Sequence, residues 1–522
     1  MESKEKFIST INNGYNLKGD YIILGASVYN EEVLSEAQVK IPLRTLNRHG
    51  LIAGATGTGK TKTLQVFAEL LSEKGIPCLM MDIKGDLSGL AAEGKSNEKV
   101  EERHQKLAIP WTNNSYPVEL LSISHEKGVR LRATVSEFGP VLFSKILELN
   151  DAQTGAVSLV FKYCDDQKMP LVDLKDFKKT LHYITNEGKS EIEKDYGRIS
   201  TTSASTIIRK IIEIEQQGAE IFFGEISFEV EDLLRIDEKG RGYLNIIRLS
   251  DIQDKPKLFS TFMLSLLAEI YATFPEEGDP EQPKLVLFID EAHLIFKEAS
   301  KALLSQLETI IKLIRSKGVG VFFITQQPTD VPAAILSQLG LKVQHALRAF
   351  TAQDRKAIKS TAENYPVTAF YKTDVLLTHL GIGEALVTAL NEKGIPTPLV
   401  HTMLRAPQSR MDILEPEEIV QLEKRSFLVK KYNQSIDRES AFEILHQKLE
   451  AKAKEKEEVI VKPTTKNSPK KETSVIRDVV DSTAGRQVMR TVARELTRGL
   501  LGVLGVGTTR RRTTRKKNVN WF

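Results

Sequence analysis

The run Gly-Ala-Thr-Gly-Thr-Gly-Lys-Thr at residues 54–61 constrains this chain more than any other feature. It satisfies G-x-x-x-x-G-K-[ST], the glycine-rich loop whose backbone N–H groups hold phosphates. The apolar residues 51–53 before it predict a buried strand. Residues 60–74 after it predict a helix with one apolar face, which Gly75 ends. A strand, a glycine loop and a helix N-terminus together form an anion site, so the sequence predicts polyphosphate binding.

Particular residues of this loop have expected roles. Lys60 is expected to reach the β- and γ-phosphates of ATP, and the Thr61 hydroxyl is expected to hold Mg²⁺. The alternative is a glycine-rich turn with an accidental Lys-Thr, which leaves the flanking strand and helix unexplained. The residues expected to contact the nucleotide are Gly54, Ala55, Thr56, Gly57, Thr58, Gly59, Lys60 and Thr61.

Length and composition limit the class of protein. The chain has 522 residues, more than one ordinary domain needs. It has no run of about 18 apolar residues that would predict a membrane-spanning helix. Its charged N-terminus predicts no secretory signal, so we expect a cytoplasmic protein. Cys78 and Cys164 lie in apolar segments and are expected to be buried free thiols.

Strand and helix patterns alternate through the middle of the chain, which predicts an α/β fold with a mostly parallel sheet covered by helices on both faces. Predicted strands occupy residues 77–82, 243–249, 285–289 and 319–325, and predicted helices occupy 258–274 and 299–316. The predicted organisation is a small N-terminal β element (1–48), the first part of a P-loop ATPase core (49–137), a helical insertion (138–220), the second part of the core (221–405), C-terminal helices including an exposed one at 441–461 (406–461), a disordered linker (462–485) and a basic amphipathic tail (486–522).

The apolar residues 285–289 are followed by Asp290 and Glu291, which is the Walker B pattern. Asp290 is expected to orient the Mg²⁺ shell, and Glu291 to polarise the attacking water as general base. An apolar strand that ends in Asp-Glu is common by chance, but downstream of a P-loop it indicates ATP hydrolysis. Residues 290–293 also spell the Asp-Glu-Ala-His box of another helicase superfamily. The later motifs of that superfamily are absent, so His293 is expected to pack or cap.

Four further side chains are candidates for catalysis. Gln326 follows the strand predicted at 319–325 and could act as a sensor that positions water, with Gln327 beside it. Arg315 and Arg348 are candidates for an arginine finger, which a neighbouring subunit would supply. For each of these side chains an ordinary structural role stays open, as a turn residue or a surface ion pair.

The segment Asp-Ile-Lys-Gly-Asp at residues 82–86 follows the second predicted strand. Ligands of open α/β folds bind at the carboxyl edge of the sheet, where these side chains are expected. Asp82 could assist water or metal there, or it could form a tight turn with the following glycine.

With these motifs, the chain resembles the bacterial DUF853 (YjgR-like) branch of HerA-like ATPases, in the HerA–FtsK superfamily of DNA-pumping motors. The resemblance runs from about residue 20 to about residue 405. The segments that carry it are 49–53 (HGLIA), 82–90 (DIKGDLSGL), 136–140 (SEFGP), 316–321 (SKGVGV), 338–340 (QLG) and 343–350 (VQHALRAF). Two features depart from that branch: Gln327 stands where Asn is expected, and the N-terminal β region is short for a full HerA barrel.

The resemblance implies a RecA-like core with a helical insertion, a hexameric ring, and a motor that translocates or unwinds double-stranded DNA. The residues to which it assigns the roles described above are Lys60, Asp290, Glu291, Gln326 and Arg348. A second hypothesis is a nucleotide-dependent switch or scaffold ATPase that moves no DNA and could act at a membrane surface.

The tail at 486–522 carries ten Lys or Arg residues against one acid, Glu495. Residues 486–501 have apolar residues at helical spacing and predict a basic amphipathic helix. Such a tail could bind DNA through its phosphates, lie on an anionic membrane, or remain solvated, and its composition leaves all three open.

Overall fold

The computed structural model describes residues 2–297, 301–434, 436 and 438–461. The chain divides into two units, Met1–Lys454 and Glu455–Phe522, and the first contains the whole sheet. The predicted linker at 462–485 and the predicted tail helix lie outside the described residues.

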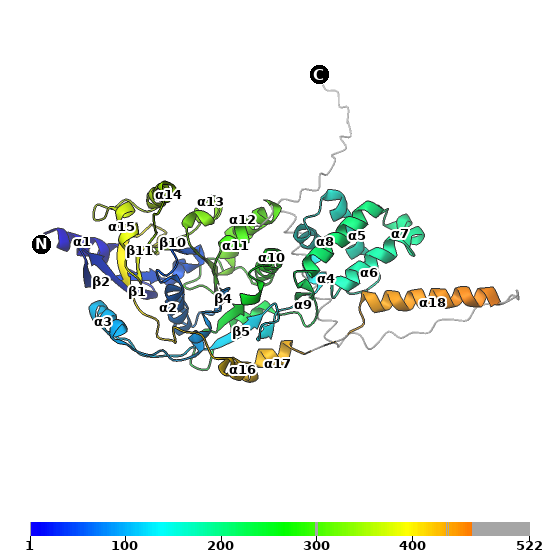
Figure 1. Cartoon of the computed structure of the whole chain (residues 1–522), viewed down its shortest axis with the longest axis horizontal. Helices are drawn as coiled ribbons and strands as arrows, with labels where there is room; N and C mark the ends of the chain where they lie inside the picture. The colour runs from blue at the N-terminus through cyan, green and yellow to red at the C-terminus, as the bar shows by residue number, and fades with distance from the viewer. Residues whose placement is uncertain (1, 298–300, 435, 437, 462–522) are drawn as a thin grey trace, which may run out of the picture. The chain divides into compact units, whose positions relative to one another are not determined.

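One twelve-stranded sheet organises the first unit, in the order β2-β1-β12-β11-β10-β3-β9-β8-β4-β7-β5-β6. The eight strands from β10 to β6 run parallel, which confirms the predicted mostly parallel sheet. Figure 1 shows the strands among their helices. The strands are β1 (Tyr21–Tyr29), β2 (Glu32–Pro42), β3 (Gly50–Ala53), β4 (Cys78–Asp82), β5 (Val118–Ser122), β6 (Val129–Arg130), β7 (Leu244–Arg248), β8 (Leu285–Ile289), β9 (Val319–Thr325), β10 (Leu341–Gln344), β11 (Glu384–Thr388) and β12 (Val400–Leu404).

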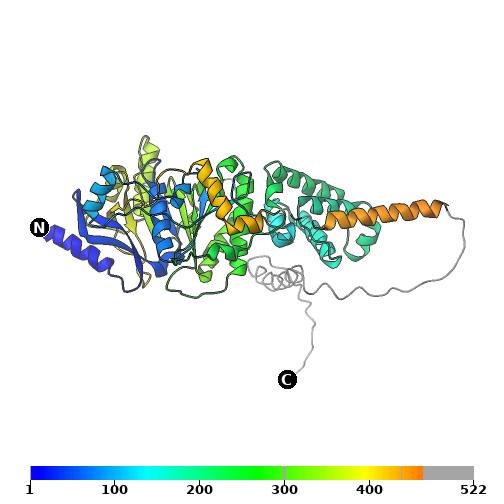
Figure 2. The same ribbon diagram turned by 90° about the horizontal axis from the view of Figure 1, so that it is seen from below.

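The helices can be followed in Figure 1 and, from below, in Figure 2. They are α1 (Glu2–Gly14), α2 (Lys60–Glu73), α3 (Glu98–Leu107), α4 (Val135–Ile146), α5 (Asp151–Asp166), α6 (Leu174–Thr185), α7 (Lys189–Asp195), α8 (Thr201–Glu215), α9 (Ala219–Phe222), α10 (Pro256–Thr273), α11 (His293–Lys297), α12 (Lys301–Ile314), α13 (Ala333–Leu336), α14 (Ala352–Glu363), α15 (Thr373–His379), α16 (Pro416–Arg425), α17 (Phe427–Tyr432) and α18 (Ala441–Val461).

Alternating residues of the central strands enter two separate apolar cores. In β8, Leu287 belongs to the core that contains α10 and α12, whereas Phe288 belongs to the core that contains α1 and α2. Successive side chains of a strand point to opposite faces, so burial of both indicates a sheet covered on both sides. This is why the parallel strands appear in the sequence as continuous apolar runs.

The N-terminal strands do not stand apart from the core. β1 pairs with β2 and also, antiparallel, with β12, where Ala26 lies opposite Met403. Through β12 and β11 the N-terminal hairpin therefore extends the sheet that carries the P-loop. The sequence predicted strands here, but it did not show that they join the main sheet.

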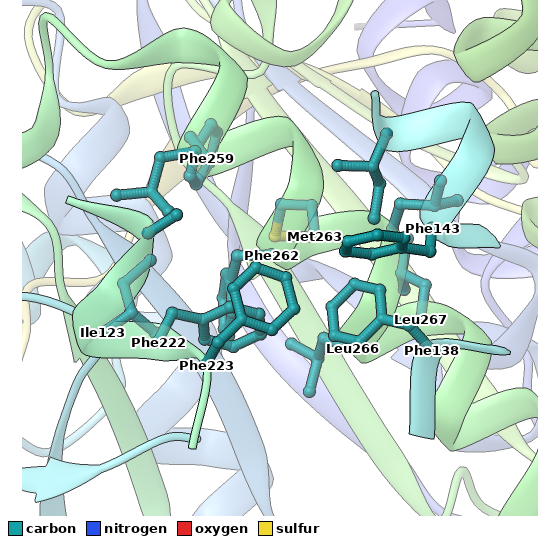
Figure 3. Close-up of a cluster of buried hydrophobic side chains, with 14 of the residues drawn as sticks. Ile123, Phe138, Phe143, Phe222, Phe223, Phe259, Phe262, Met263, Leu266 and Leu267 are labelled. Carbon is teal, nitrogen blue, oxygen red and sulfur yellow. The ribbon is translucent and has the colours of Figure 1, made fainter. Parts of the chain in front are cut away.

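The helices α4 to α9 lie between β6 and β7 in the chain, so the predicted insertion is helical. Its aromatic side chains pack against the core helix α10: the ring of Phe222 lies 5.9 Å from that of Phe138 and 5.7 Å from that of Phe262. Figure 3 shows these rings in one cluster with Phe143, Phe223 and Met263. The insertion is thus anchored to the sheet through a continuous apolar contact.

The C-terminal helices are also anchored. The prediction of an exposed helix at 441–461 is wrong for its first turns, because Ala441 and Leu445 are fully buried. The Ala441 N–H donates to the carbonyl of Pro170 (3.0 Å), and the Ser440 hydroxyl donates to Asp176 of α6 (2.6 Å). A composition rich in Glu, Lys and Ala concealed this short apolar contact.

Candidate nucleotide-binding site

The predicted site residues meet at the carboxyl edge of the parallel strands. β9 lies between β3, which enters the P-loop, and β8, which ends at Asp290 and Glu291. Ala53 at the end of β3 is in register with Thr325 of β9 and with Gln344 of β10. The P-loop therefore begins where Gln326 leaves β9.

Glycine is required at several positions of the P-loop. Gly57 and Gly59 have φ angles of 79° and 109°, in the left-handed region that residues with a Cβ rarely adopt. A Cβ on Gly54 would lie 2.5 Å from the Cβ of His345. Backbone hydrogen bonds hold the loop from both sides, from Ala55 N to Ala346 O (2.8 Å) and from Gly383 N to Thr58 O (3.1 Å). The loop is preorganised by its neighbours rather than by its own turns alone.

Lys60 begins α2 and lies almost buried at the base of this loop, with 7% of its surface exposed. Its ammonium donates to the carbonyl oxygens of Gly54 (2.7 Å) and Ala55 (3.1 Å). Burial lowers the pKa of Lys60, and the positive charge of Lys84 lowers it further. Thr61 follows in the first turn of α2, where its side chain is partly buried.

Asp290 and Glu291 follow β8 and are 3% and 7% exposed. Burial raises the pKa of Asp290 to about 6. Glu291 has a φ of 47°, and its N–H donates to the Asp290 carboxylate at 2.9 Å. A left-handed backbone costs a residue with a Cβ about 1 kcal/mol or more. Such strain is typical of functional sites, where the fold aims one side chain.

Glu291 has a cationic partner that the sequence did not reveal. The ammonium of Lys84, in the loop after β4, lies 2.5 Å from Glu291 Oε1. The second oxygen, Oε2, is buried and makes no hydrogen bond among the described residues, although His293 Nδ1 lies 3.2 Å away. The sequence does contain this lysine, within the segment 82–86. Its pairing with Glu291 depends on β4 lying beside β8, which the sequence does not show.

Asp82 forms a turn, the second of its two predicted roles. Its carboxylate accepts hydrogen bonds from the backbone N–H groups of Gly85 (2.7 Å), Asp86 (3.0 Å) and Leu87 (3.1 Å). Burial raises the pKa of Asp82 to about 7. Because three N–H groups already occupy this carboxylate, it fixes the loop that carries Lys84.

The other candidates separate into two groups. Gln326 is exposed directly after β9, and Arg348 is exposed two residues after Ala346, which contacts the P-loop. Arg315 precedes β9 and therefore lies at the opposite edge of the sheet, where it is 3.6 Å from Asp279. The structure brings Gln326 and Arg348 to the nucleotide edge but leaves Arg315 away from the P-loop of its own chain.

The protein itself would supply only some of the ligands of a bound Mg²⁺ ion. Within the described ranges, no three His, Cys, Asp or Glu side chains cluster in a way that could hold a metal ion. Mg²⁺ in nucleotide sites takes one or two protein ligands and completes its shell with phosphates and water. The buried carboxylate of Asp290 and the Thr61 hydroxyl fit this requirement.

A phosphate loop that joins a parallel strand to a helix, with acids at the end of β8, one strand removed across β9, defines a P-loop nucleotide-binding protein. A family model described as "Helicase HerA-like C-terminal" matches residues 28–512. The chain therefore belongs to the HerA-like helicase family, which confirms the resemblance at this level; the DUF853 branch stays a prediction. In the part of the chain that the structure describes, no helix is long and apolar enough to cross a bilayer.

Individual relatives are distant. The DNA double-strand break repair helicase HerA of Sulfolobus acidocaldarius is 22% identical over 371 residues, or 70% of this chain and 66% of that protein. The protein of the same name from Sulfurisphaera tokodaii is 24% identical over 363 residues, or 68% and 64%. The chain thus spans just under two thirds of their lengths. A solved structure of the bacterial conjugative coupling protein TrwB, in complex with sulphate, matches with a TM-score of 0.49 and 16% identity over 76% of this chain and 96% of that one.

Proposed function

We propose that this protein is a Mg²⁺-dependent ATP hydrolase that works as a homo-oligomeric motor on double-stranded DNA. The observation that carries the proposal is the meeting of the P-loop, Asp290 and the buried Glu291 at one edge of the sheet. Membership of the HerA-like family supports it, as do the two relatives named as DNA repair helicases.

Each residue of this edge has a role in hydrolysis. The P-loop N–H groups and Lys60 would bind the phosphates, and Asp290 with Thr61 would hold Mg²⁺, which neutralises phosphate charge. Glu291 would accept the proton of the attacking water. Gln326 leaves β9 beside the P-loop and would orient that water.

A ring is supported by side chains near the P-loop that stay exposed in a single chain. Arg348 is exposed and has no ion pair within the described ranges. Beside it, Phe350 is 83% exposed, and Ile382, next to the glycine that contacts the P-loop, is 74% exposed. Exposed apolar side chains around a charged site favour a second protein surface there. We propose Arg348, rather than Arg315, as the finger that a neighbouring subunit supplies, within a ring that the family resemblance suggests is hexameric.

The charge distribution bears on the DNA. The chain has 73 Lys or Arg residues and 69 Asp or Glu residues. Residues 462–522 contain 15 of the basic residues and 4 of the acidic ones. Residues 1–461 therefore contain 58 basic and 65 acidic residues. A net acidic body repels phosphates, so contacts to DNA need local basic groups. Candidates are the tail and the exposed side chains of Arg355, Lys356 and Lys359 on α14.

The same acidic body favours a second candidate, a nucleotide-dependent switch or scaffold that moves no DNA. Its ATP site would be the same, and its tail could bind an anionic membrane instead. The two candidates differ only in what hydrolysis is coupled to.

ATPase rate with and without duplex DNA, at low salt, tests the proposal. We expect DNA to raise the rate of the full-length protein, and we expect the effect to fade with added salt as counterions compete for the phosphates. Glu291→Gln is the control for contaminating ATPases, because it should bind ATP without turnover. A rate indifferent to DNA, in a protein that also fails to bind DNA, would exclude the motor and leave the switch.

A further inference from the structure

We propose that Lys84 is a second phosphate-binding lysine, whose ammonium pairs either with Glu291 or with the terminal phosphate of ATP. The triphosphate would then draw Lys84 away and free Glu291 for catalysis, whereas a diphosphate would leave the pair intact. This inference rests on the proposed ATP site and adds to it a residue that distinguishes ATP from ADP.

The backbone at Lys84 is fixed. Asp82 accepts N–H bonds from three residues just beyond Lys84, and the Gln253 amide donates to the carbonyl of Ile83 at 2.6 Å. Gly85 completes the turn with a φ of 75°. The loop therefore presents Lys84 from a constant position at the end of β4, which is separated from the P-loop strand β3 by the two strands β8 and β9.

The side chain of Lys84, by contrast, can move. It is 41% exposed, whereas Glu291 is 9% exposed by the same side-chain measure. A lysine carries its charge on a flexible four-carbon stem, so its ammonium can exchange one oxygen partner for another without backbone movement. The member of this ion pair that has room to move is thus the lysine, because the glutamate side chain is buried.

The charges around Lys84 favour an anion between two lysines. Burial lowers the pKa of Lys60 most, and the positive charge of Lys84 lowers it further, as expected of two ammonium groups that repel each other. Both also interact with Asp290 and Glu291. A phosphate placed between two ammonium groups removes this repulsion and gains two charge-assisted contacts.

The ion pair also bears on catalysis. A general base must present a free oxygen to water, and Lys84 occupies Oε1 of Glu291 at 2.5 Å. The other oxygen is buried. Exchange of Lys84 from Glu291 to phosphate would therefore make the base available only when a γ-phosphate is bound.

Nucleotide affinity tests this inference without reference to turnover. Binding of ADP and of the slowly hydrolysed analogue ATPγS would be measured on the full-length protein by displacement of a fluorescent nucleotide. We expect Lys84→Met, which keeps the aliphatic stem, to weaken ATPγS binding by about tenfold and to leave ADP binding unchanged, since it removes one charge-assisted contact. The matched control is Lys178→Met, because Lys178 forms an ion pair of 2.7 Å with Glu215 between two insertion helices.

A double-mutant cycle gives a second readout. Glu291→Gln removes the competing carboxylate, so it should tighten ATPγS binding, and this gain should vanish in the Lys84→Met background. Equal effects on ADP and ATPγS, or the same gain with and without Lys84, would overturn the inference. A wild-type protein that hydrolyses ATP while Lys84→Met binds both nucleotides normally would refute the role of Lys84 alone. Failure of the wild-type protein to bind either nucleotide would refute the proposed function and this inference with it.

Discussion

His49 and Glu291 are two buried titratable side chains at opposite ends of the parallel strands, and their surroundings differ. His49 precedes β3; its Nδ1 accepts from Val321 N (3.0 Å), and its Nε2 donates to Ile311 O (2.8 Å). Both ring nitrogens are thus used to join β3, β9 and α12. Glu291 has a strained backbone, one oxygen without a hydrogen bond and an ion pair with the partly exposed Lys84. Hydrogen bonds of His49 therefore fix the amino ends of these strands. At their carboxyl ends, we propose that the ion pair of Glu291 can exchange.

The largest effect on hydrolysis should come from a substitution in the P-loop, at the carboxyl ends of the parallel strands. Lys60→Ala is expected to reduce ATP hydrolysis to background and to weaken nucleotide binding, because it removes the charge that we propose binds the phosphates. The fold should survive, since Lys60 bonds only to carbonyl groups of its own loop among the described residues. Hydrolysis and thermal unfolding, measured on the same preparation, check both. Normal turnover would remove the P-loop from the mechanism.

Arg348 should rank next. Arginine fingers contribute about 10³–10⁵ in rate, so Arg348→Ala should lower hydrolysis by that order if a neighbour uses it. Mixed with Glu291→Gln subunits, it should regain some activity, because some interfaces would then combine an intact Arg348 with an intact Glu291. No recovery, in mixtures shown to co-assemble, would argue that Arg348 acts within its own chain or not at all.

A substitution of His49, at the amino ends of the parallel strands, should lower the stability of the fold instead. His49→Ala is expected to destabilise the protein at pH 7 by about 3 kcal/mol, since it leaves a cavity and strips two buried backbone groups of their partner. Burial lowers the pKa of His49 from 6.5 to about 4, so between these values the unfolded chain binds more protons and stability falls as pH falls. Denaturant unfolding at pH 7 and pH 5 should therefore show the gap between wild type and variant shrinking, by about 2 kcal/mol. A gap that widens on acidification would show that His49 is charged in the fold.

Arg315 should give the smallest effect. Its contact with Asp279 is half exposed and 3.6 Å long, and such pairs contribute less than about 1 kcal/mol. Arg315→Ala should shift the unfolding free energy by no more than that and should change hydrolysis far less than Arg348→Ala. If Arg315→Ala lost as much ATPase activity as we expect of Arg348→Ala, Arg315 would become the better candidate for the arginine finger.

Local patterns predicted much of this molecule. β8 and β9 have the predicted bounds, because strands buried on both faces are uninterrupted apolar runs that end in polar residues. The P-loop, Asp290 and Glu291 could be found because each is adjacent in sequence to the element that positions it.

What could not be predicted depends on which strands become neighbours. The pair formed by Lys84 and Glu291 exists because β4 lies beside β8, and the N-terminal hairpin enters the sheet because β1 pairs with β12. Contacts between residues far apart in the chain leave no local periodicity. Two buried residues, Ala441 and Leu445, are likewise too few to change the polar pattern of α18.

The left-handed backbone of Glu291 has an evolutionary consequence. At a φ of 47°, glycine and asparagine are the residues that fit with least strain. Replacement of Glu291 by either would relieve strain while it removes the proposed general base, so selection for stability would not oppose the change. A nucleotide-binding switch therefore lies one tolerated substitution away from this ATPase, and descendants that have lost hydrolysis should retain the fold.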